Sequence, residues 1–131
     1  MKTALVGGVD VPTGHYIGGA WVDTAATFET HSPLDWEAGP LATISRGDSE
    51  AAAAAVDAAV IGFETWGSFT VHERAEVMHR LADLIEANNE QIAMVETLDM
   101  GFMYESMRQR LVARGALNLS LIHISEPTRP Y

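Results

Sequence analysis

Histidines and carboxylates are the side chains of this sequence that could bind a metal or move a proton. The five histidines stand at positions 15, 31, 72, 79 and 123, and only His72 and His79 fall within one predicted helix. These two share a helix face because they lie seven residues apart, but two nitrogens without a third ligand make a poor zinc site. Carboxylate pairs such as Asp83 and Glu86 fall on a solvated helix face, where they add solubility and lack the burial that general acid–base catalysis needs.

The spacing of the glycines and the lack of cysteine both argue against an active site in this chain. Gly7, Gly8 and Gly14 are not followed by Gly-Lys-Ser/Thr, and no G-x-G-x-x-G joins a strand to a helix, so no nucleotide-phosphate loop is predicted. The sequence has no cysteine, which excludes disulfides, thiolate metal sites and a thiol nucleophile within it.

Length and composition indicate one compact, soluble domain. The chain has 131 residues, of which 47% are apolar. Its net charge is -10, and its basic residues do not gather into a stripe. A nucleic-acid surface is therefore not expected. No apolar run approaches the roughly 20 residues that a membrane helix needs, and no signal peptide develops at the N-terminus. The expected compartment is the cytoplasm.

The first 47 residues are predicted to contain two β-hairpins. Residues 1–14 are expected to be a flexible N-terminus. The Gly18-Gly19 pair between the apolar runs 16–17 and 21–22 predicts the first hairpin, because glycine adopts positive φ at little cost. Residues 27–30 and 41–44 predict the second hairpin, and the prolines between Ser32 and Pro40 predict a loop that connects its strands.

Three helices, and a fourth over residues 103–114, are predicted next. Asp48 or Ser49 caps the first helix, over residues 50–66. Thr70 and Glu73 have the spacing of a capping box at the start of the second helix. The third helix covers about residues 90–100 and ends at Gly101, because glycine suits a left-handed cap.

Hydrophobic periodicity predicts which helix faces are buried, and prolines predict where regular structure ends. The spacing i, i+4 and i+7 puts Val56, Val60 and Phe63 on one face, which we expect to be buried. The second helix carries an apolar stripe of Val77, Leu81, Leu84 and Ile85. Residues 119–131 match neither period and contain prolines at 127 and 130, so a tail without regular structure is expected. The predicted fold class is α+β, with two hairpins followed by three to four helices.

Several short strings occur in an order and at separations that resemble the N-terminal region of the aldehyde dehydrogenase superfamily, over residues 15–118. The strings are Tyr16–Val22, Thr27–Pro33, Leu41–Thr43, Ala58-Ala59 followed by Phe63 and Trp66, Glu73–Ala75, Leu81–Glu86, Glu96–Gly101 and then Glu105. The resemblance implies an α/β fold of which residues 15–118 form the outer part of the cofactor-binding domain.

The resemblance also implies a reaction. Members of the family use NAD or NADP to oxidise an aldehyde to a carboxylic acid: a cysteine thiolate attacks the aldehyde, hydride leaves to the nicotinamide, and a glutamate-activated water hydrolyses the thioester. None of these groups, and no cofactor contact, lies in the part of the family pattern present here. We therefore expect a truncated leading segment of a larger, homo-oligomeric enzyme, inactive by itself.

One site is carried over by the resemblance. Some members hold a structural Na⁺ or K⁺ with backbone oxygens at the positions matching Thr30 and His31 and with the aspartate matching Asp99, and hard oxygen ligands suit such ions. The alternative is that Asp99 only helps to finish its helix. A ligand from later in the family pattern is absent, so weak binding is expected.

The sequence departs from the family pattern after Gly101, where Phe102-Met103-Tyr104 replaces the usual Lys-Pro. This variation is similar to branches that act on semialdehydes. A different class of function also stays open: a free-standing acidic helical module that binds a protein partner through exposed apolar faces.

The last 13 residues, 119–131, resemble the in-frame translation of a transposase sequencing-library adapter. The alternative is a natural terminal tail. We predict that genomic reads from the source locus diverge from the present codons at about codon 119. A read that crosses codon 119 into the same codons would refute the adapter origin.

Overall fold

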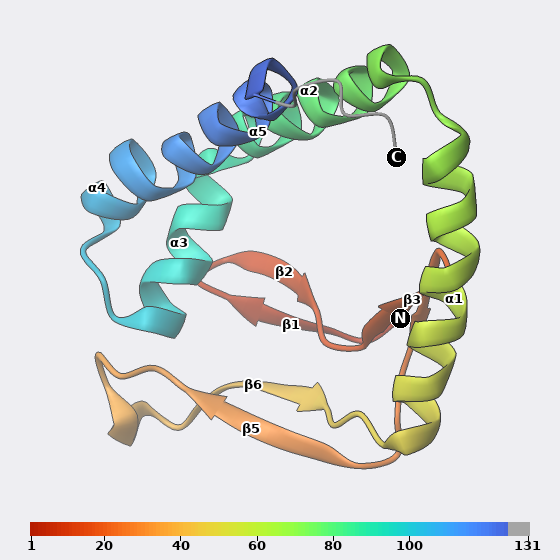
Figure 1. Ribbon diagram of the computed structural model, residues 1–131. Helices are drawn as coiled ribbons and strands as arrows, with labels where there is room; N and C mark the ends of the chain where they lie inside the picture. Colours follow the sequence, from red (N-terminus) through yellow and green to blue (C-terminus); the bar gives the residue numbers. More distant parts are fainter. Residues whose placement is uncertain (126–131) are drawn as a thin grey trace.

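A computed structural model of the protein describes residues 1–125, with side chains through residue 120. Six short strands come first: β1 (Thr3–Val6), β2 (Val9–Pro12), β3 (His15–Ile17), β4 (Ala20–Val22), β5 (Thr27–His31) and β6 (Pro40–Ser45). The helices are α1 (Ser49–Ser68), α2 (Val71–Ala87), α3 (Asn89–Met100), α4 (Tyr104–Ser106) and α5 (Ala113–Ser125), with a 3-10 turn, η1 (Trp36–Ala38), and a π-helical stretch, η2 (Met107–Val112). Short strand pairs followed by helices confirm the predicted α+β class (Figure 1).

Both predicted hairpins are present. Strands β3 and β4 pair antiparallel around Gly18 and Gly19, whose φ angles are 58° and 83°. Tyr16 lies opposite Trp21 in this pair, with ring centroids 5.1 Å apart. Strands β5 and β6 form the second hairpin, and the loop between them contains η1, capped by the Asp35 side chain.

The N-terminus contradicts the expectation of a flexible segment over residues 1–14, because β1 and β2 form a third hairpin there. Gly7 and Gly8 form its turn with φ angles of 56° and 84°, just as Gly18 and Gly19 form the turn of the β3–β4 hairpin. The hairpin is held by packing that the sequence pattern does not show: Val6 is only 3% exposed, and Gly7 lies against the side chains of Met94 and Leu98 in α3.

Side-chain caps define the starts of α1 and α2 as predicted. The Asp48 carboxylate accepts a hydrogen bond from the Ala51 N–H at 2.8 Å. At α2 the capping box is complete, since the Glu73 N–H donates to the Thr70 hydroxyl at 3.2 Å and the Thr70 N–H donates to the Glu73 carboxylate at 2.7 Å. Helix α3 ends at Gly101 in the left-handed conformation, also as predicted.

The C-terminal part of the chain corrects the expectation for the tail. Helical structure runs from residue 104 through α4, η2 and α5 to Ser125, so residues 119–125 are helical. No glycine or proline occurs in residues 116–125, and the helix therefore continues beyond the point where the hydrophobic period weakens. The predicted effect of Pro127 and Pro130 lies outside the described residues.

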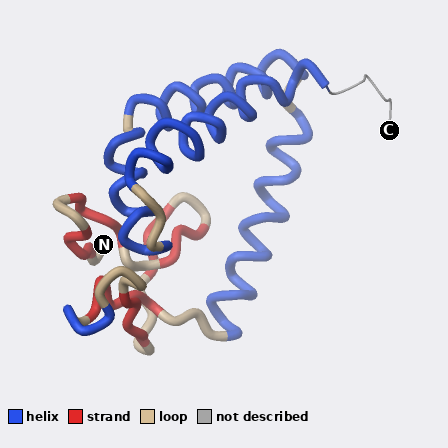
Figure 2. The backbone as a smooth tube through the Cα atoms, turned by 90° about the vertical axis from the view of Figure 1, so that its left-hand side faces the viewer, coloured by secondary structure: helices blue, strands red, loops and turns tan. Residues whose placement is uncertain are grey.

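The hydrophobic core lies among α2, α3, η2 and α5, and its buried side chains are small or flexible. Ala93, Met107 and Val112 form the buried cluster, with Ile85 packed against it. Helix α5 lies along α2 in the same layer, as two views of the chain show (Figures 1 and 2). In the part of the chain that the structure describes, no helix is long and apolar enough to span a membrane.

The expected burial of the α1 face is wrong for this chain. Helix α1 contributes no buried residue, and Val56, Val60 and Phe63 are 62%, 56% and 76% exposed. Figure 2 shows the reason: α1 runs alone along one side of the molecule, from the strands to the start of α2, apart from the other helices. The α2 stripe is also only partly covered, since Leu84 remains 59% exposed.

The first prediction tests the packing of the N-terminal hairpin. A Cβ at Gly7 would lie 2.6 Å from Met94 Cγ and 2.8 Å from Leu98 Cδ1, whereas a Cβ at Gly8 meets nothing within 4 Å. Both glycines have positive φ, so both alanine variants carry backbone strain. We expect Gly7→Ala to destabilise the chain by about 2 kcal/mol more than Gly8→Ala. Urea denaturation measures the difference, and equal destabilisation would contradict the packing of the hairpin on α3.

The second prediction concerns pH. The Thr70 backbone N–H, and to a lesser extent its hydroxyl, hydrogen-bonds to the Glu73 carboxylate and holds the pKa of that carboxyl below its ordinary value. The stability that this carboxyl contributes is therefore complete above its ordinary pKa and is lost as the pH falls through the lowered value. Acidification should fray the first turn of α2.

The amide chemical shift of Thr70, followed by NMR through an acid titration, reports this fraying. In the control variant Glu73→Gln, the amide oxygen keeps the capping geometry without titrating. The Thr70 shift should move through the acid titration in the parent chain and stay constant in Glu73→Gln, and the parent chain should lose in acid the extra stability that it has over the variant at neutral pH. An acid transition of the same size in Glu73→Gln would show that another group is responsible.

Candidate functional site

The end of strand β5 and the loop that follows it lie against the C-terminal end of α3 (Figure 1). The Ser32 hydroxyl joins the two segments, because it donates to the Leu98 carbonyl at 2.5 Å. The same oxygen accepts a hydrogen bond from the Leu34 N–H at 3.3 Å, which folds the loop back on itself. The structure therefore brings the loop that follows Thr30 and His31 to the helix end that carries Asp99.

Thr30 and His31 sit at an irregularity of the β5–β6 pair. The register shifts between them, so this is a bulge-like break in the ladder at the two residues whose carbonyl oxygens are the predicted ligands. Such breaks leave backbone groups unpaired and available to other partners. The side chains are engaged elsewhere: the Thr30 hydroxyl donates to the Ala42 carbonyl at 3.4 Å, and the His31 ring stacks on Trp36 at 4.6 Å.

Asp99 lies in the last turn of α3, and its side chain is exposed and forms no hydrogen bond or ion pair with the side chains described, those of residues 1–120, or with the backbone of residues 1–125. The last turn of α3 holds no basic residue, so the negative partial charge of the helix C-terminus is not offset locally. A carboxylate at this end raises the negative potential further. The local potential at this helix end is therefore negative, which is compatible with either role predicted for Asp99.

The donor set of this site is made of oxygen atoms, which suits a hard monovalent cation. Over residues 1–125 there is no group of three or more histidine, aspartate or glutamate side chains that could hold a metal, so His72 and His79 gain no third ligand. His72 instead lies 3.3 Å from Glu76 along α2.

Sequence reasoning missed the role of Ser32 in this junction and the close approach of the loop to Gly101, which was predicted only as a helix cap. A Cβ at Gly101 would lie 2.9 Å from Pro33 Cγ, so glycine allows the loop to approach the helix end as well as supplying the cap. A serine before proline indicates a local turn. Nothing in the sequence shows that its hydroxyl reaches a residue 66 positions away.

The glycine pairs do not form a dinucleotide site. Gly7-Gly8 and Gly18-Gly19 occupy hairpin turns between antiparallel strands, whereas a pyrophosphate loop joins a strand to a helix N-terminus. These two glycine turns therefore lack the geometry of a pyrophosphate loop.

Comparison with known proteins identifies the class of protein to which this architecture belongs. The family model for the aldehyde dehydrogenase family matches residues 21–123. Aldehyde dehydrogenase family 2 member C4 of Arabidopsis thaliana is 38% identical over 94 residues, which are 69% of this chain and 18% of that protein. Acetaldehyde dehydrogenase 2 of Cupriavidus necator is 37% identical over 89 residues, 66% of this chain and 17% of that protein.

Solved structures that resemble this chain are also aldehyde dehydrogenases. A variant of aldehyde dehydrogenase from Bacillus cereus superposes with a TM-score of 0.80 at 31% identity, covering 91% of this chain and 26% of that one. The NAD⁺ complex of the Bacillus cereus enzyme gives a TM-score of 0.77 at 33% identity, covering 82% of this chain and 22% of that one. The chain belongs to the aldehyde dehydrogenase family and corresponds to its N-terminal part. It spans about a fifth of the length of the curated relatives.

Proposed function

We propose that this chain is the N-terminal part of an NAD(P)-dependent aldehyde dehydrogenase that converts an aldehyde, NAD(P)⁺ and water into a carboxylic acid, NAD(P)H and a proton. The observation that carries the proposal is the shared backbone: the chain superposes on the Bacillus cereus enzyme over 91% of its residues. Further support comes from relatives whose names specify acetaldehyde as substrate and NAD⁺ as bound cofactor.

The role of these residues in the enzyme is structural. A thioester mechanism needs a thiolate, and the 131 residues contain no cysteine, so the nucleophile belongs to another part of the polypeptide. The hairpin turns do not cradle the cofactor phosphates, and we therefore assign no step of hydride transfer to this chain. Its contribution is a frame of hairpins and helices against which the remainder of the enzyme is built.

The finer features of the enzyme are also proposals. The Phe102-Met103-Tyr104 departure from the family pattern favours a semialdehyde as substrate, and the resemblance favours a homo-oligomer. The proposed compartment is the cytoplasm, as expected from the sequence. The rival function, a free-standing acidic helical module, loses support because its exposed apolar faces belong to a segment that matches about a quarter of longer enzymes.

We further propose that the junction between β5 and α3 holds a structural Na⁺ or K⁺, with the carbonyl oxygens of Thr30 and His31 and the Asp99 carboxylate as ligands. Support comes from the break in the ladder at Thr30 and His31 and from the unpaired Asp99 at a helix end without basic residues. The ion would hold the loop after β5 against α3.

The reaction is tested on the complete coding sequence recovered from the source locus. The full-length protein should reduce NAD⁺ or NADP⁺ in the presence of an aldehyde, with a semialdehyde the best substrate of a panel that includes aliphatic and aromatic aldehydes. The 131-residue chain should give no turnover, because it lacks the nucleophile. Absorbance of the reduced nicotinamide measures both. Turnover by the 131-residue chain, or an inactive full-length protein with intact cofactor binding, would overturn the proposal.

The cation site is tested by the salt dependence of stability. K⁺ or Na⁺ should raise the melting temperature of the full-length enzyme relative to choline at equal ionic strength, since a ligand that binds only the folded state stabilises it. Asp99→Asn should abolish the difference. Asp83→Asn, which removes an exposed carboxylate from α2, should leave it intact. A cation effect of equal size in both variants would remove the assignment to Asp99.

A further inference from the structure

Residues 104–125 form one continuous helical run, made of α4, η2 and α5. Among residues 104–120 of this run, the buried side chains are those of Met107, Val112 and Ala116, which are 2%, 8% and 0% exposed. Val112 and Ala116 lie four residues apart and share a face of an α-helix. Met107 and Val112 lie five residues apart, which would set them about 140° apart in an α-helix. The π stretch brings both to the core, because its hydrogen-bonded turn spans five residues.

An α-helical winding of η2 is a second arrangement of the same residues. With Met107 held in the core, the residues three, four and seven positions later would face inward. These are Arg110, Leu111 and Arg114, and all three are exposed in the structure. The α winding would bury Leu111 in place of Val112, and it would turn α5 by about 100° relative to α2. The two registers therefore differ in which apolar side chain enters the core.

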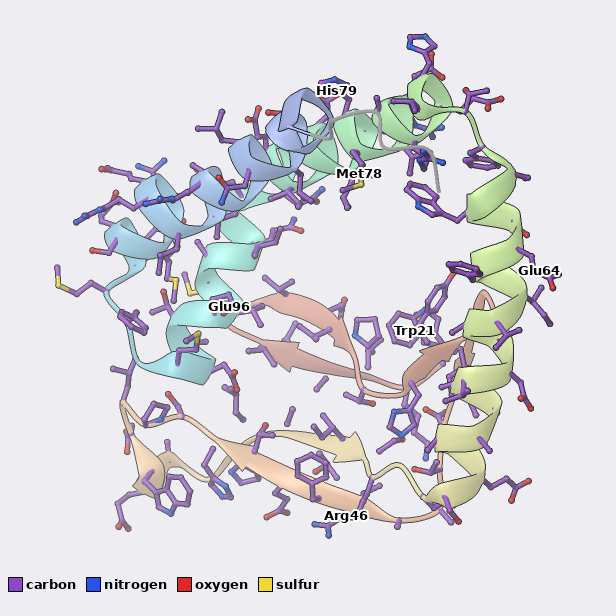
Figure 3. The ribbon with its side chains drawn as sticks, viewed as in Figure 1. Trp21, Arg46, Glu64, Met78, His79 and Glu96 are labelled. Carbon is purple, nitrogen blue, oxygen red and sulfur yellow. The ribbon has the colours of Figure 1, made fainter. Side chains whose placement is uncertain are left out.

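Charged side chains favour the π register without making the α register an unfolded state. Nitrogen-bearing side chains at the α4 end of the helical run extend outward from the molecule (Figure 3). In the α register Arg110 and Arg114 would start on the inner face. Their long apolar stems allow the guanidinium groups to reach solvent from such positions. The α register is thus a folded alternative in which Leu111 is buried.

Asn89, the first residue of α3, contacts η2 across the fold. Its Nδ2 donates a hydrogen bond to the Arg108 carbonyl at 3.0 Å, 19 positions further along the chain. The Asn89 side chain does not cap its own helix, since α3 begins with no side-chain cap. Its Oδ1 is buried and has no hydrogen-bond partner within the described residues. Burying a polar atom without a partner costs free energy, so the bond to η2 is what favours this position of the side chain.

The contact between Asn89 and η2 lies at the surface of the molecule. Asn89 and Arg108 both line a polar cleft of about 420 Å³, and their hydrogen bond is only partly buried. Water competes for hydrogen bonds at such a position. The bond is therefore able to open while the side chains of the core stay packed.

We propose that η2 is a two-register element and that the Asn89 side chain is the latch that holds it in the π register. While Asn89 donates to the Arg108 carbonyl, Val112 faces the core. When this bond is broken, η2 rewinds as an α-helix and Leu111 takes the place of Val112. Helix α5 then turns about its axis against α2. The element is a conformational switch between α3 and the α2–α5 layer, and it does not depend on the proposed reaction.

The lack of cysteine allows the register to be read by thiol labelling. Leu111→Cys and Val112→Cys, each made in the 131-residue chain, report the two registers. Each is combined with Asn89→Ala, or with the matched control Asn88→Ala. Asn88 is the neighbouring residue, and its amide donates to the Leu84 carbonyl of α2 and not to η2. Maleimide labelling under native conditions, followed by peptide mass spectrometry, gives the rate at each position.

In the parent chain and with Asn88→Ala, position 111 should label at least about tenfold faster than position 112, because position 111 is 50% exposed and position 112 only 8%. With Asn89→Ala the order should reverse. Asn89→Asp keeps the shape of the side chain and removes its N–H donors, so it should give the same reversal.

Four results would overturn the proposal. An unchanged order with Asn89→Ala would show that the bond does not set the register, and fast labelling at both positions would show that the helix frays instead of rewinding. Reversal in Asn88→Ala as well would assign the effect to the α2–α3 corner. Loss of folding in both Asn89 variants, measured by circular dichroism, would also contradict the latch, because a change of register leaves the chain folded.

Discussion

Burial of apolar surface is the interaction on which this structure depends, and the chain has more such surface than it covers. Its core is built from alanines, Met107 and the smaller aliphatic side chains, while Phe63, Trp36 and Leu34 remain more than half exposed. Hydrophobic stabilisation scales with the area removed from water, so a core of small side chains contributes little per residue. Local devices, namely capped helices and glycine turns, add to the order of this segment.

Those local devices are also what the sequence reveals best. The Thr70–Glu73 capping box, the Gly101 cap and the Gly18-Gly19 turn were all predictable, because each depends on residues within a few positions of one another. The N-terminal hairpin was missed for the opposite reason. Its turn chemistry is the same, but its stability comes from Met94 and Leu98, which lie far along the chain. Helix boundaries at the C-terminus were missed because the hydrophobic period weakens while helix propensity persists.

The candidate cation site also combines features that could be named from the sequence with features that only the structure shows. Thr30, His31 and Asp99 could be named only through the family resemblance, since backbone carbonyl ligands have no signature in residue type. The structure adds a connection between the two segments, the hydrogen bond from the Ser32 hydroxyl to the Leu98 carbonyl. No periodicity or motif identifies such a contact. The sequence correctly predicted that α1 has an apolar face, but the prediction that this face is buried was wrong. Periodicity shows that a face is apolar and does not show which segment covers it.

The π-helical stretch η2 has a consequence for the evolution of this segment. A π turn holds one residue more than an α turn, and here the Arg108 carbonyl within it accepts a hydrogen bond from the Asn89 side chain. Loss of one residue between positions 107 and 112 would turn every side chain of α5 by about 100° relative to α2. Homologous segments should therefore tolerate substitutions in this stretch far more readily than changes in its length.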